Sequence, residues 1–372
     1  MRYSFRQKFA TWFGPVYHGM TLHQWLKILH DRELTIDWCC KYHILPTTLK
    51  SISNSLLAPI EQKKFSGPLQ AVTVPAPIFI LGHWRSGTTL LHNLLAQDHR
   101  YAFPNLYQVL NPLTFLLSEE TLITRLFALI MPRQRLFDPM PFHLKIPHED
   151  EFIFWHTSGL SSYMFWSFPR SGVRFDKYMS LREVDEQERE EWKNDFINFL
   201  KKVTFKYHKP LILKSPQHTA RVRYLLELFP AAKFIHIYRE PYRVFQSTAK
   251  LNRFVLGIAS YQNYRFEDVQ ERILRQYREM FYCYWEDRER MAPGQLSEVQ
   301  FEVLESNPLA ELERIYRELQ LADFEEVREK MTSYIQTLTS YQKNAFPPLE
   351  DELKRIVYQQ WQDNFERWSY AR

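Results

Sequence analysis

The sequence predicts an α/β fold in which a P-loop-like central parallel sheet is flanked by helices, with helical additions at the N- and C-terminal ends. Residues 76–95 give a short apolar strand, a glycine loop and the start of a helix, in that order. Two further apolar runs each end in a cation and are each followed by a helical pattern. Because strands that alternate with helices form parallel sheets with right-handed crossovers, we expect ligands at the carboxyl ends of the strands.

The first part of the chain is predicted to be helical. Thr21 and Gln24 form a capping-box pattern, and apolar residues follow them at helical spacing. Pro75 and Pro77 end a polar stretch and precede the first strand, which sets a boundary near residue 70. We therefore expect a helical N-terminal extension over 1–70 and a main domain over 71–372.

The remaining elements follow from periodicity and chain breakers. The segment 104–147 contains six prolines, so we expect an irregular cover interrupted by an apolar helix over 121–130. After it, the pattern predicts strands over 211–213, 234–238 and 299–303, and helices over 182–205, 222–229, 308–319, 323–335 and 350–368.

The glycine loop has the spacing of an anion-binding site. Gly82 and Gly87 are five residues apart and precede Thr88 and Thr89, as in a P-loop, but Thr88 replaces the P-loop lysine and Arg85 lies inside the loop. The chain has only 9 glycines in 372 residues, so two of them here favour a ligand over a plain turn. Loop N–H groups and a helix dipole that meet at one point suit a phosphate or phosphosulfate.

Composition restricts the classes of partner. There are 48 basic and 43 acidic residues, so the net charge of +5 does not indicate a nucleic-acid polymer, whereas an anionic small molecule would suffice. Three cysteines, two of them adjacent, provide neither a disulfide framework nor a metal site. The absence of a long apolar run predicts a cytoplasmic protein, although the basic, aromatic residues 2–13 can contact a membrane surface instead of packing on the body. The oligomeric state is not indicated.

Three predicted strands deliver cations to one edge of the sheet. Arg85 follows the first strand, Lys214 ends the second and Arg239 ends the third. A P-loop kinase would need an acid at a neighbouring strand end to hold magnesium. Cations in these places neutralise an anionic ligand directly, so no metal is expected.

Two segments resemble the nucleotide signatures of sulfotransferases, which use 3′-phosphoadenosine-5′-phosphosulfate (PAPS). They are FILGHWRSGTTLL and FIHIYREPYRVFQST. The resemblance implies that the loop holds the 5′-phosphosulfate, and that Arg239 and Ser247, eight residues apart, hold the 3′-phosphate. The loop residues concerned are Arg85, Ser86, Gly87, Thr88 and Thr89.

The resemblance covers residues 76–345 and is closest to the branch with tyrosylprotein and bacterial sulfotransferases. This branch has an arginine in the loop, which Arg85 matches. The segment LILKSP resembles its strand that ends in a lysine beside the sulfate, which implies that role for Lys214. The segment SYQKNAF implies that Lys343 approaches the nucleotide.

The catalytic base is less clearly marked. Tyrosylprotein enzymes have a glutamate soon after the loop helix, whereas FPNLYQVLNP offers Gln108 and no acid. Glu149, in the cluster HEDE, is the predicted base, with its neighbours Asp150 and Glu151 as alternatives. These acids also suit a helix start without any catalytic role. The weaker alternatives are His143, His218 and His236.

We therefore expect metal-independent, in-line transfer of a sulfuryl group from PAPS to an acceptor hydroxyl, with Arg85, Lys214 and loop N–H groups stabilising the leaving phosphate. The alternatives are a P-loop kinase or other nucleotide phosphotransferase, or a non-catalytic nucleotide or membrane-surface binding protein. The acceptor can be a small molecule, glycan, lipid or peptide. The aromatic run 152–168 indicates an apolar or ring-shaped acceptor, unless it forms core.

Overall fold

The computed structural model describes residues 19–130, 142–338 and 346–372. The chain forms two compact units, each built from segments that are separate in the sequence. The first unit takes Met1–Val74, Pro104–His208 and Asn252–Arg265, and the second takes Pro75–Phe103, Lys209–Leu251 and Phe266–Arg372. The predicted division into residues 1–70 and 71–372 stays a prediction.

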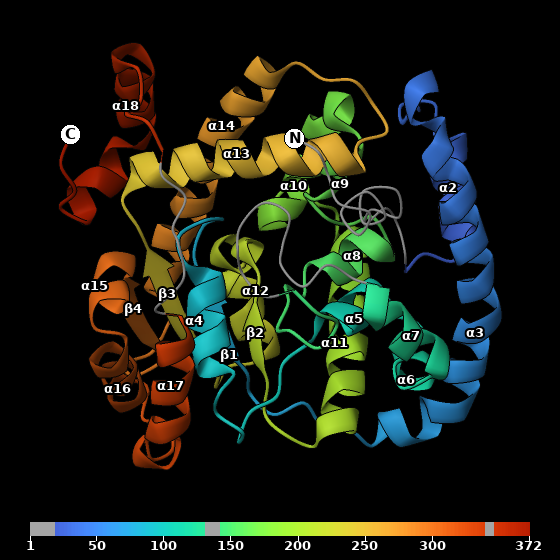
Figure 1. Cartoon of the computed structure of the whole chain (residues 1–372), viewed down its shortest axis with the longest axis horizontal. Helices are drawn as coiled ribbons and strands as arrows, with labels where there is room; N and C mark the ends of the chain where they lie inside the picture. Colours follow the sequence, from blue (N-terminus) through green and yellow to red (C-terminus); the bar gives the residue numbers. More distant parts are fainter. Residues whose placement is uncertain (1–18, 131–141, 339–345) are drawn as a thin grey trace. The chain divides into compact units, whose positions relative to one another are not determined.

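The second unit contains a parallel sheet of four strands in the order β2-β1-β3-β4 (Figure 1). In register, Ile80 of β1 lies opposite Lys214 of β2 on one side and Ile235 of β3 on the other. The predicted parallel sheet is confirmed. The strands are β1 (Ile78–Leu81), β2 (Ile212–Lys214), β3 (Lys233–Tyr238) and β4 (Leu296–Gln300).

Alternating side chains of the strands cover two faces of this sheet, because successive residues of a strand point to opposite sides. Ile78, Ile80 and Ile235 belong to one apolar core together with residues of α4, α15, α16 and α17. On the other face Phe79 stacks on Phe234 and meets the His218 ring edge-on. The helices of this unit are α4 (Thr88–Leu95), η3 (Pro216–Ala220), α12 (Val222–Leu228), α14 (Phe266–Arg288), α15 (Phe301–Ser306), α16 (Pro308–Glu318), α17 (Glu325–Thr337) and α18 (Asp351–Arg367).

The elements assigned in the described residues of the first unit are helices, around a core rich in aromatic side chains. Trp192 stacks on Phe154 and on Phe196, and all three are fully buried. The long helix α13 (Pro241–Ala259) begins in the second unit and ends in the first. The other helices are α2 (Leu22–His30), η1 (Trp38–His43), α3 (Ile44–Gln70), α5 (Leu106–Leu110), α6 (Phe115–Ser118), α7 (Leu122–Ile130), α8 (Phe152–His156), α9 (Met164–Ser167), η2 (Pro169–Ser171), α10 (Gly172–Ser180) and α11 (Glu186–Tyr207).

Most predicted elements are present, and three differ in extent. The segment 104–147 is more regular than expected, since it contains α5 and α6 as well as the predicted helix, α7. The helix predicted from residue 182 starts at Glu186, because Asp185 caps it by accepting a hydrogen bond from the N–H of Glu188. The strand predicted over 299–303 ends at Gln300, and Phe301 is already the first residue of α15.

The capping box predicted at the N-terminal end is confirmed, since Thr21 and Gln24 exchange hydrogen bonds at the start of α2. Within the described ranges, no helix combines the length and the apolar character that crossing a membrane requires.

Candidate active site

The glycine loop joins β1 to α4 and is fixed at its first residue by a hydroxyl group. The N–H of Gly82 donates to Oγ1 of Thr219, at 2.7 Å. Further along, the side chain of Ser86 donates to the carbonyl oxygen of His83, at 2.8 Å. Ser86 therefore shapes the loop from inside, and its buried hydroxyl has this partner within the loop itself.

Gly87 has a backbone that only glycine adopts readily, because its φ is 104°. A Cβ atom at this position would lie 2.2 Å from Cδ2 of Phe301, which is far inside van der Waals contact. The loop thus passes directly over the Phe301 ring. Both glycines that the sequence singles out are required by the loop's path, since Gly82 also has a positive φ, of 141°.

The helix start after Gly87 presents donors for an anion. Within the part of the chain that the structure describes, no group accepts a hydrogen bond from the N–H of Gly87, Thr88 or Thr89. These N–H groups are at the N-terminus of α4, where the helix dipole adds partial positive charge. The arrangement fits a phosphate or sulfate group.

The second signature lies beside the first. Nε of Arg85 donates to Oγ of Ser247, at 2.8 Å, although the two residues are 162 positions apart. Nη1 of Arg239 donates to the carbonyl oxygen of Arg85, at 3.3 Å. The structure therefore brings together three residues that the sequence predicts for the nucleotide.

Arg239 is held in place by an aromatic ring. Its guanidinium carbon lies 4.1 Å from the centroid of the Phe301 ring, which is a cation–π geometry. Burial lowers the pKa of this half-buried guanidinium from its ordinary value, against the attraction of Glu302. An anionic ligand would relieve this cost, because it would supply negative charge beside a partly desolvated cation.

Lys214 ends β2 and is buried, with 3% of its surface exposed. It lies opposite Ile80, two residues before Gly82, so β2 delivers it to the same end of the sheet as the loop. Lys343 lies outside the described residues. Among residues 19–130, 142–338 and 346–372, no group of three or more His, Cys, Asp or Glu side chains is arranged to hold a metal ion.

The acidic cluster belongs to the first unit, where its three members have different surroundings. Glu149 is half-buried and accepts a hydrogen bond from the hydroxyl of Tyr163. Asp150 and Glu151 are fully buried, and Glu151 accepts from the hydroxyl of Ser161, at 2.7 Å. Glu151 also precedes the first residue of α8, but its side chain makes no cap hydrogen bond there.

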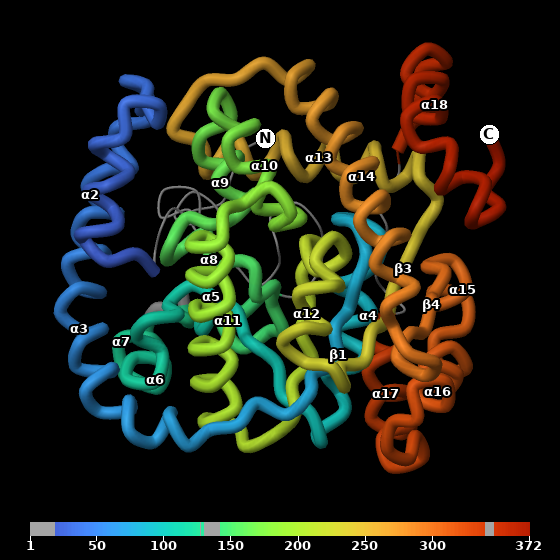
Figure 2. Tube along the Cα trace, turned by 180° about the vertical axis from the view of Figure 1, so that it is seen from behind, coloured from blue at the N-terminus to red at the C-terminus, as the bar shows by residue number. Residues whose placement is uncertain are grey.

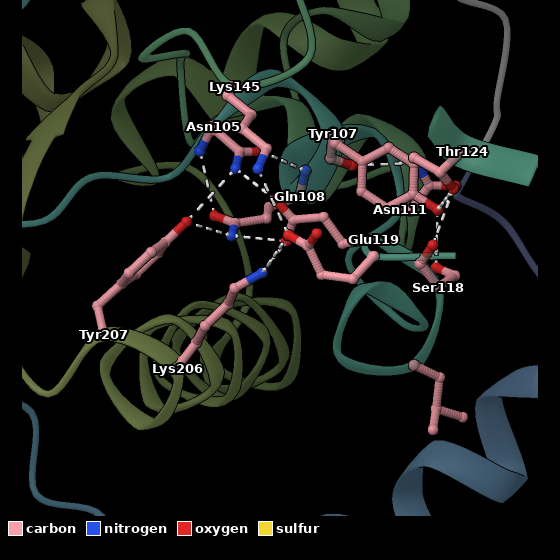
Figure 3. A network of polar contacts seen from close by, with 12 residues as sticks. Asn105, Tyr107, Gln108, Asn111, Ser118, Glu119, Thr124, Lys145, Lys206 and Tyr207 are labelled. Atoms are coloured by element: carbon pink, nitrogen blue, oxygen red, sulfur yellow. Dashed lines mark hydrogen bonds and ion pairs between the residues drawn. The ribbon is translucent and has the colours of Figure 1, made fainter. Parts of the chain in front are cut away.

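Gln108 has a structural role in this protein (Figure 3). It closes a capping box with Asn105 at the start of α5, and its Nε2 donates to Glu119 and to Tyr207. The buried Glu119 is in turn paired with Lys206, at 2.5 Å. An acid in place of Gln108 would meet the carboxylate of Glu119, which explains why this stretch supplies an amide and no base.

The histidines proposed as weaker alternatives are placed differently. His218 and His236 are fully buried in the second unit, one on η3 and one in β3. The His236 ring lies 4.1 Å from the ring of Tyr284, and burial lowers the pKa of its imidazole. His143 is exposed and belongs to the first unit. Packing accounts for His218 and His236 without a catalytic role.

Sequence reasoning missed two residues that shape the loop. Thr219 binds the first glycine, and Phe301 lies under the second glycine and under Arg239. Neither residue belongs to a recognisable motif, and Phe301 falls within the strand predicted over 299–303. Only the long-range contacts reveal their roles.

A family model described as "Sulfotransferase family" matches residues 77–326, which is more than half of the chain. The chain belongs to the sulfotransferase family. This sulfotransferase is 34% identical over 368 residues to "Omega-hydroxy-beta-dihydromenaquinone-9 sulfotransferase Stf3" of Mycobacterium bovis, and the match covers 98% of this chain and 94% of the relative. The protein of that name from Mycobacterium tuberculosis matches equally well. The protein is therefore a transferase, as its sequence predicts.

Solved sulfotransferases share the fold. The crystal structure of sulfotransferase STF9 from Mycobacterium avium superimposes with a TM-score of 0.68 at 18% identity, covering 91% of this chain and 88% of that one. The structure of STF1 from Mycobacterium tuberculosis gives a TM-score of 0.61 at 16% identity, covering 91% of both chains. The predicted α/β fold is confirmed.

Proposed function

We propose that this sulfotransferase takes PAPS as its donor and transfers the sulfuryl group, without a metal ion, to the hydroxyl of an apolar, lipid-like acceptor. One observation carries the donor assignment: Arg85, Ser247 and Arg239 meet beside the N-terminus of α4, as the two nucleotide signatures require. Two anionic groups of one nucleotide would then be bound within the second unit.

The donor's two charged ends have separate sets of residues in this proposal. Ser86, Gly87, Thr88 and Thr89 belong to the loop that receives the phosphosulfate. Arg239 and Ser247 bind the 3′-phosphate, through charge-assisted hydrogen bonds. Lys343, outside the described residues, approaches the nucleotide.

Charge neutralisation falls to Arg85 and Lys214. In sulfuryl transfer the bond between sulfur and the bridging oxygen breaks, and negative charge develops on the phosphate that leaves. Preorganised cations and N–H groups stabilise that charge more than they stabilise the bound donor, which lowers the barrier. Lys214 is well suited because it is buried at a strand end, where its attraction to an anion is screened little.

Glu149 takes the proton of the acceptor hydroxyl. Glu149 is half-buried, whereas Asp150 and Glu151 are fully buried. The hydroxyl of Tyr163 donates to Glu149 and orients it, and Tyr163 also stacks on Trp166, with 4.1 Å between ring centroids. A base that is hydrogen-bonded to a tyrosine within an aromatic cluster suits an apolar alcohol.

The acceptor class rests on the relatives, whose name describes a hydroxylated dihydromenaquinone. We extend this to a hydroxyl on a long apolar chain, since the match covers nearly the whole of both proteins. The contact of residues 2–13 with a membrane surface lies outside the described residues and stays a prediction, as does a cytoplasmic location.

The experiment presents PAPS or ATP with three acceptors: an isoprenoid quinone hydroxylated on its side chain, in detergent, a water-soluble alcohol and a tyrosine peptide. Products are identified by mass spectrometry, with and without EDTA. We expect sulfation of the quinone at its chain hydroxyl, unchanged by EDTA. Sulfation of the peptide alone would overturn the acceptor class, and phosphorylation from ATP would overturn the donor assignment.

A further inference from the structure

The long helix α3 buries polar side chains and exposes apolar ones, which is the reverse of an ordinary surface helix. Its buried residues are polar: Thr47, Ser51, Asn54 and Glu61. A helix on a soluble domain normally turns an apolar stripe to the core and a polar face to water. The interior side of α3 therefore needs specific polar partners, because buried polar groups are costly without hydrogen bonds.

Those partners are present within the first unit. Nδ2 of Asn54 donates to the carbonyl oxygen of Met20, at 2.9 Å. Glu61 accepts from Nζ of Lys202 at 2.6 Å and from the N–H of Leu117 at 3.0 Å. These contacts bind α3 to the chain before α2, to α11 and to α6, so the helix cannot turn its other face inward without losing them.

The outward face of α3 is an apolar stripe. Its members are exposed by 40–67%: Leu45, Leu49, Ile52, Leu56 and Ile60. At about 100° per residue they fall within a sector of roughly 80°, and at about 1.5 Å per residue the stripe is about 22 Å long. Singly exposed apolar residues are ordinary, whereas a continuous stripe of this kind marks an interaction surface.

Aromatic and cationic residues extend this stripe at one end. Trp38 and Tyr42 of η1 are exposed by 83% and 53%, and Nζ of Lys41 lies over the Trp38 ring, at 4.6 Å from its centroid. Exposed Trp and Tyr with a neighbouring lysine are typical of residues at the level of lipid headgroups.

Charge on this face has one sign. Between Trp38 and Gln70 the sequence contains a single acid, Glu61, which is buried and paired with Lys202. Lys41, Lys63 and Lys64 are exposed. The stripe is thus accompanied by cations that no exposed acid of the same segment neutralises, which is complementary to an anionic surface.

A second apolar helix of the same unit lies beside α3, as Figures 1 and 2 both show for α7. Its Leu122, Ile123, Leu126 and Leu129 are exposed by 55–80%. It contains no acid, and its Arg125 is paired with the exposed Glu120, which precedes the helix, at 3.5 Å. We call the exposed apolar residues of these two neighbouring helices the α3–α7 face, which comprises these four residues and the five of the α3 stripe.

We propose that the α3–α7 face docks this protein on the surface of an anionic lipid bilayer. The apolar stripe would enter the boundary between headgroups and acyl chains, and the lysines would contact the headgroups. A lipid surface fits better than a second copy of the chain, because two identical cationic faces repel one another. The proposal is independent of the transfer chemistry, since none of these residues belongs to the donor or acceptor site.

The test is flotation of the full chain with phosphatidylglycerol or phosphatidylcholine vesicles. We expect the parent protein to float with the anionic vesicles and to be released by high salt. Leu49→Gln combined with Leu56→Gln should lower the partition coefficient at least tenfold. Lys63→Gln combined with Lys64→Gln should lower it about 25-fold at low salt, since each charge near the membrane contributes about fivefold.

Val173→Gln is the matched control, because Val173 is 74% exposed on α10 of the same unit and lies outside the face. It should leave flotation unchanged. The proposal would be wrong if the parent did not float with anionic vesicles. It would also be wrong if both double variants floated as well as the parent. Sedimentation velocity tests the other occupant. If the parent were a dimer and the double variant Leu49→Gln, Leu56→Gln were a monomer, the face would bind a second copy of the chain instead of a membrane. Unchanged melting temperatures exclude misfolding as the cause.

Discussion

Arg239→Ala provides the sharpest test of the donor site. In the proposal this side chain binds the 3′-phosphate, and the structure already fixes it over Phe301 and beside Arg85. A hydrogen bond to a charged group contributes about 1.5–3 kcal/mol. Because about 1.4 kcal/mol corresponds to a factor of ten, the variant should bind the nucleotide about 10- to 150-fold more weakly.

The assay is a thermal melt with adenosine 3′,5′-bisphosphate in EDTA. At a hundredfold excess over Kd the nucleotide stabilises the parent by about 2.7 kcal/mol. With an unfolding entropy of about 2.1 cal/mol/K per residue, a chain of this length should melt about 3–4 °C higher. If Kd rises a hundredfold, the gain in Arg239→Ala falls to about 0.4 kcal/mol, or about 0.5 °C.

Arg317→Ala is the control, since it removes the same charge from an exposed position on α16 of the same unit. It should keep the full shift. A full shift in Arg239→Ala would refute the placement of the 3′-phosphate. A shift of the parent seen only with ATP and magnesium would refute the sulfotransferase donor and favour a kinase.

Three further predictions concern chemistry and stability. Arg85→Ala and Lys214→Ala should each lower kcat by about 10²-fold or more while the protein stays folded, because each removes a cation from the leaving phosphate; rates within a few-fold of the parent would remove that role. Glu149→Gln should depress kcat strongly and leave donor Kd unchanged, and Tyr163→Phe should have a smaller effect on kcat; an unchanged rate in Glu149→Gln would assign the base elsewhere. Burial raises the pKa of Asp195 from 3.8 to about 6. Between pH 3.8 and about 6 the carboxyl group is therefore protonated more in the folded state than in the unfolded state, so stability is lost as pH rises through this window. Asp195→Asn should be more stable than the parent at pH 7 by on the order of 2 kcal/mol. Urea unfolding should show that advantage vanish near pH 4, and an advantage independent of pH would contradict the burial argument.

The donor half of the site could be predicted because it depends on local order. A strand, two glycines and a helix start determine where N–H groups point, and β1 and the start of α4 lie in the predicted order within residues 76–95. Arg239 and Ser247 follow the same logic, since one comes directly after a strand and the other lies on the next helix. Their meeting with Arg85 results from the parallel pairing of β1 with β3.

The missed features depend on contacts between distant residues. Thr219 reaches Gly82 across 137 positions, and no spacing rule connects them. Residues 299–303 alternate apolar and polar side chains, which predicts a strand through Phe301, whereas the chain turns into α15 at that residue. Periodicity predicts the helical region around α3 but cannot give its orientation, because the usual rule would have buried Leu49 and exposed Asn54.

The kinase alternative can be judged from the acids near the ends of β3 and β4, since magnesium would need one of them. Glu240 caps α13, where its carboxylate accepts from the N–H groups of Tyr242 and Arg243. Glu302 accepts from the N–H of Glu240 and from the hydroxyl of Tyr370.

Glu298, within β4, is paired with Arg288 at 2.8 Å. Burial opposes ionisation of Glu298, but the nearby His236 imidazole and hydrogen bonds from Arg288 and Tyr284 hold its pKa below the ordinary value. Each of these three acids is therefore already engaged with protein groups, and releasing one to a metal would leave its partners unsatisfied. The cations at the strand ends differ from these acids, because an added ligand would stabilise them. Arg239 lies on an aromatic ring beside Arg85, so an anion there would add a favourable electrostatic interaction. The same end of the sheet that suits a phosphosulfate is thus poorly suited to magnesium, which favours sulfuryl transfer over phosphoryl transfer.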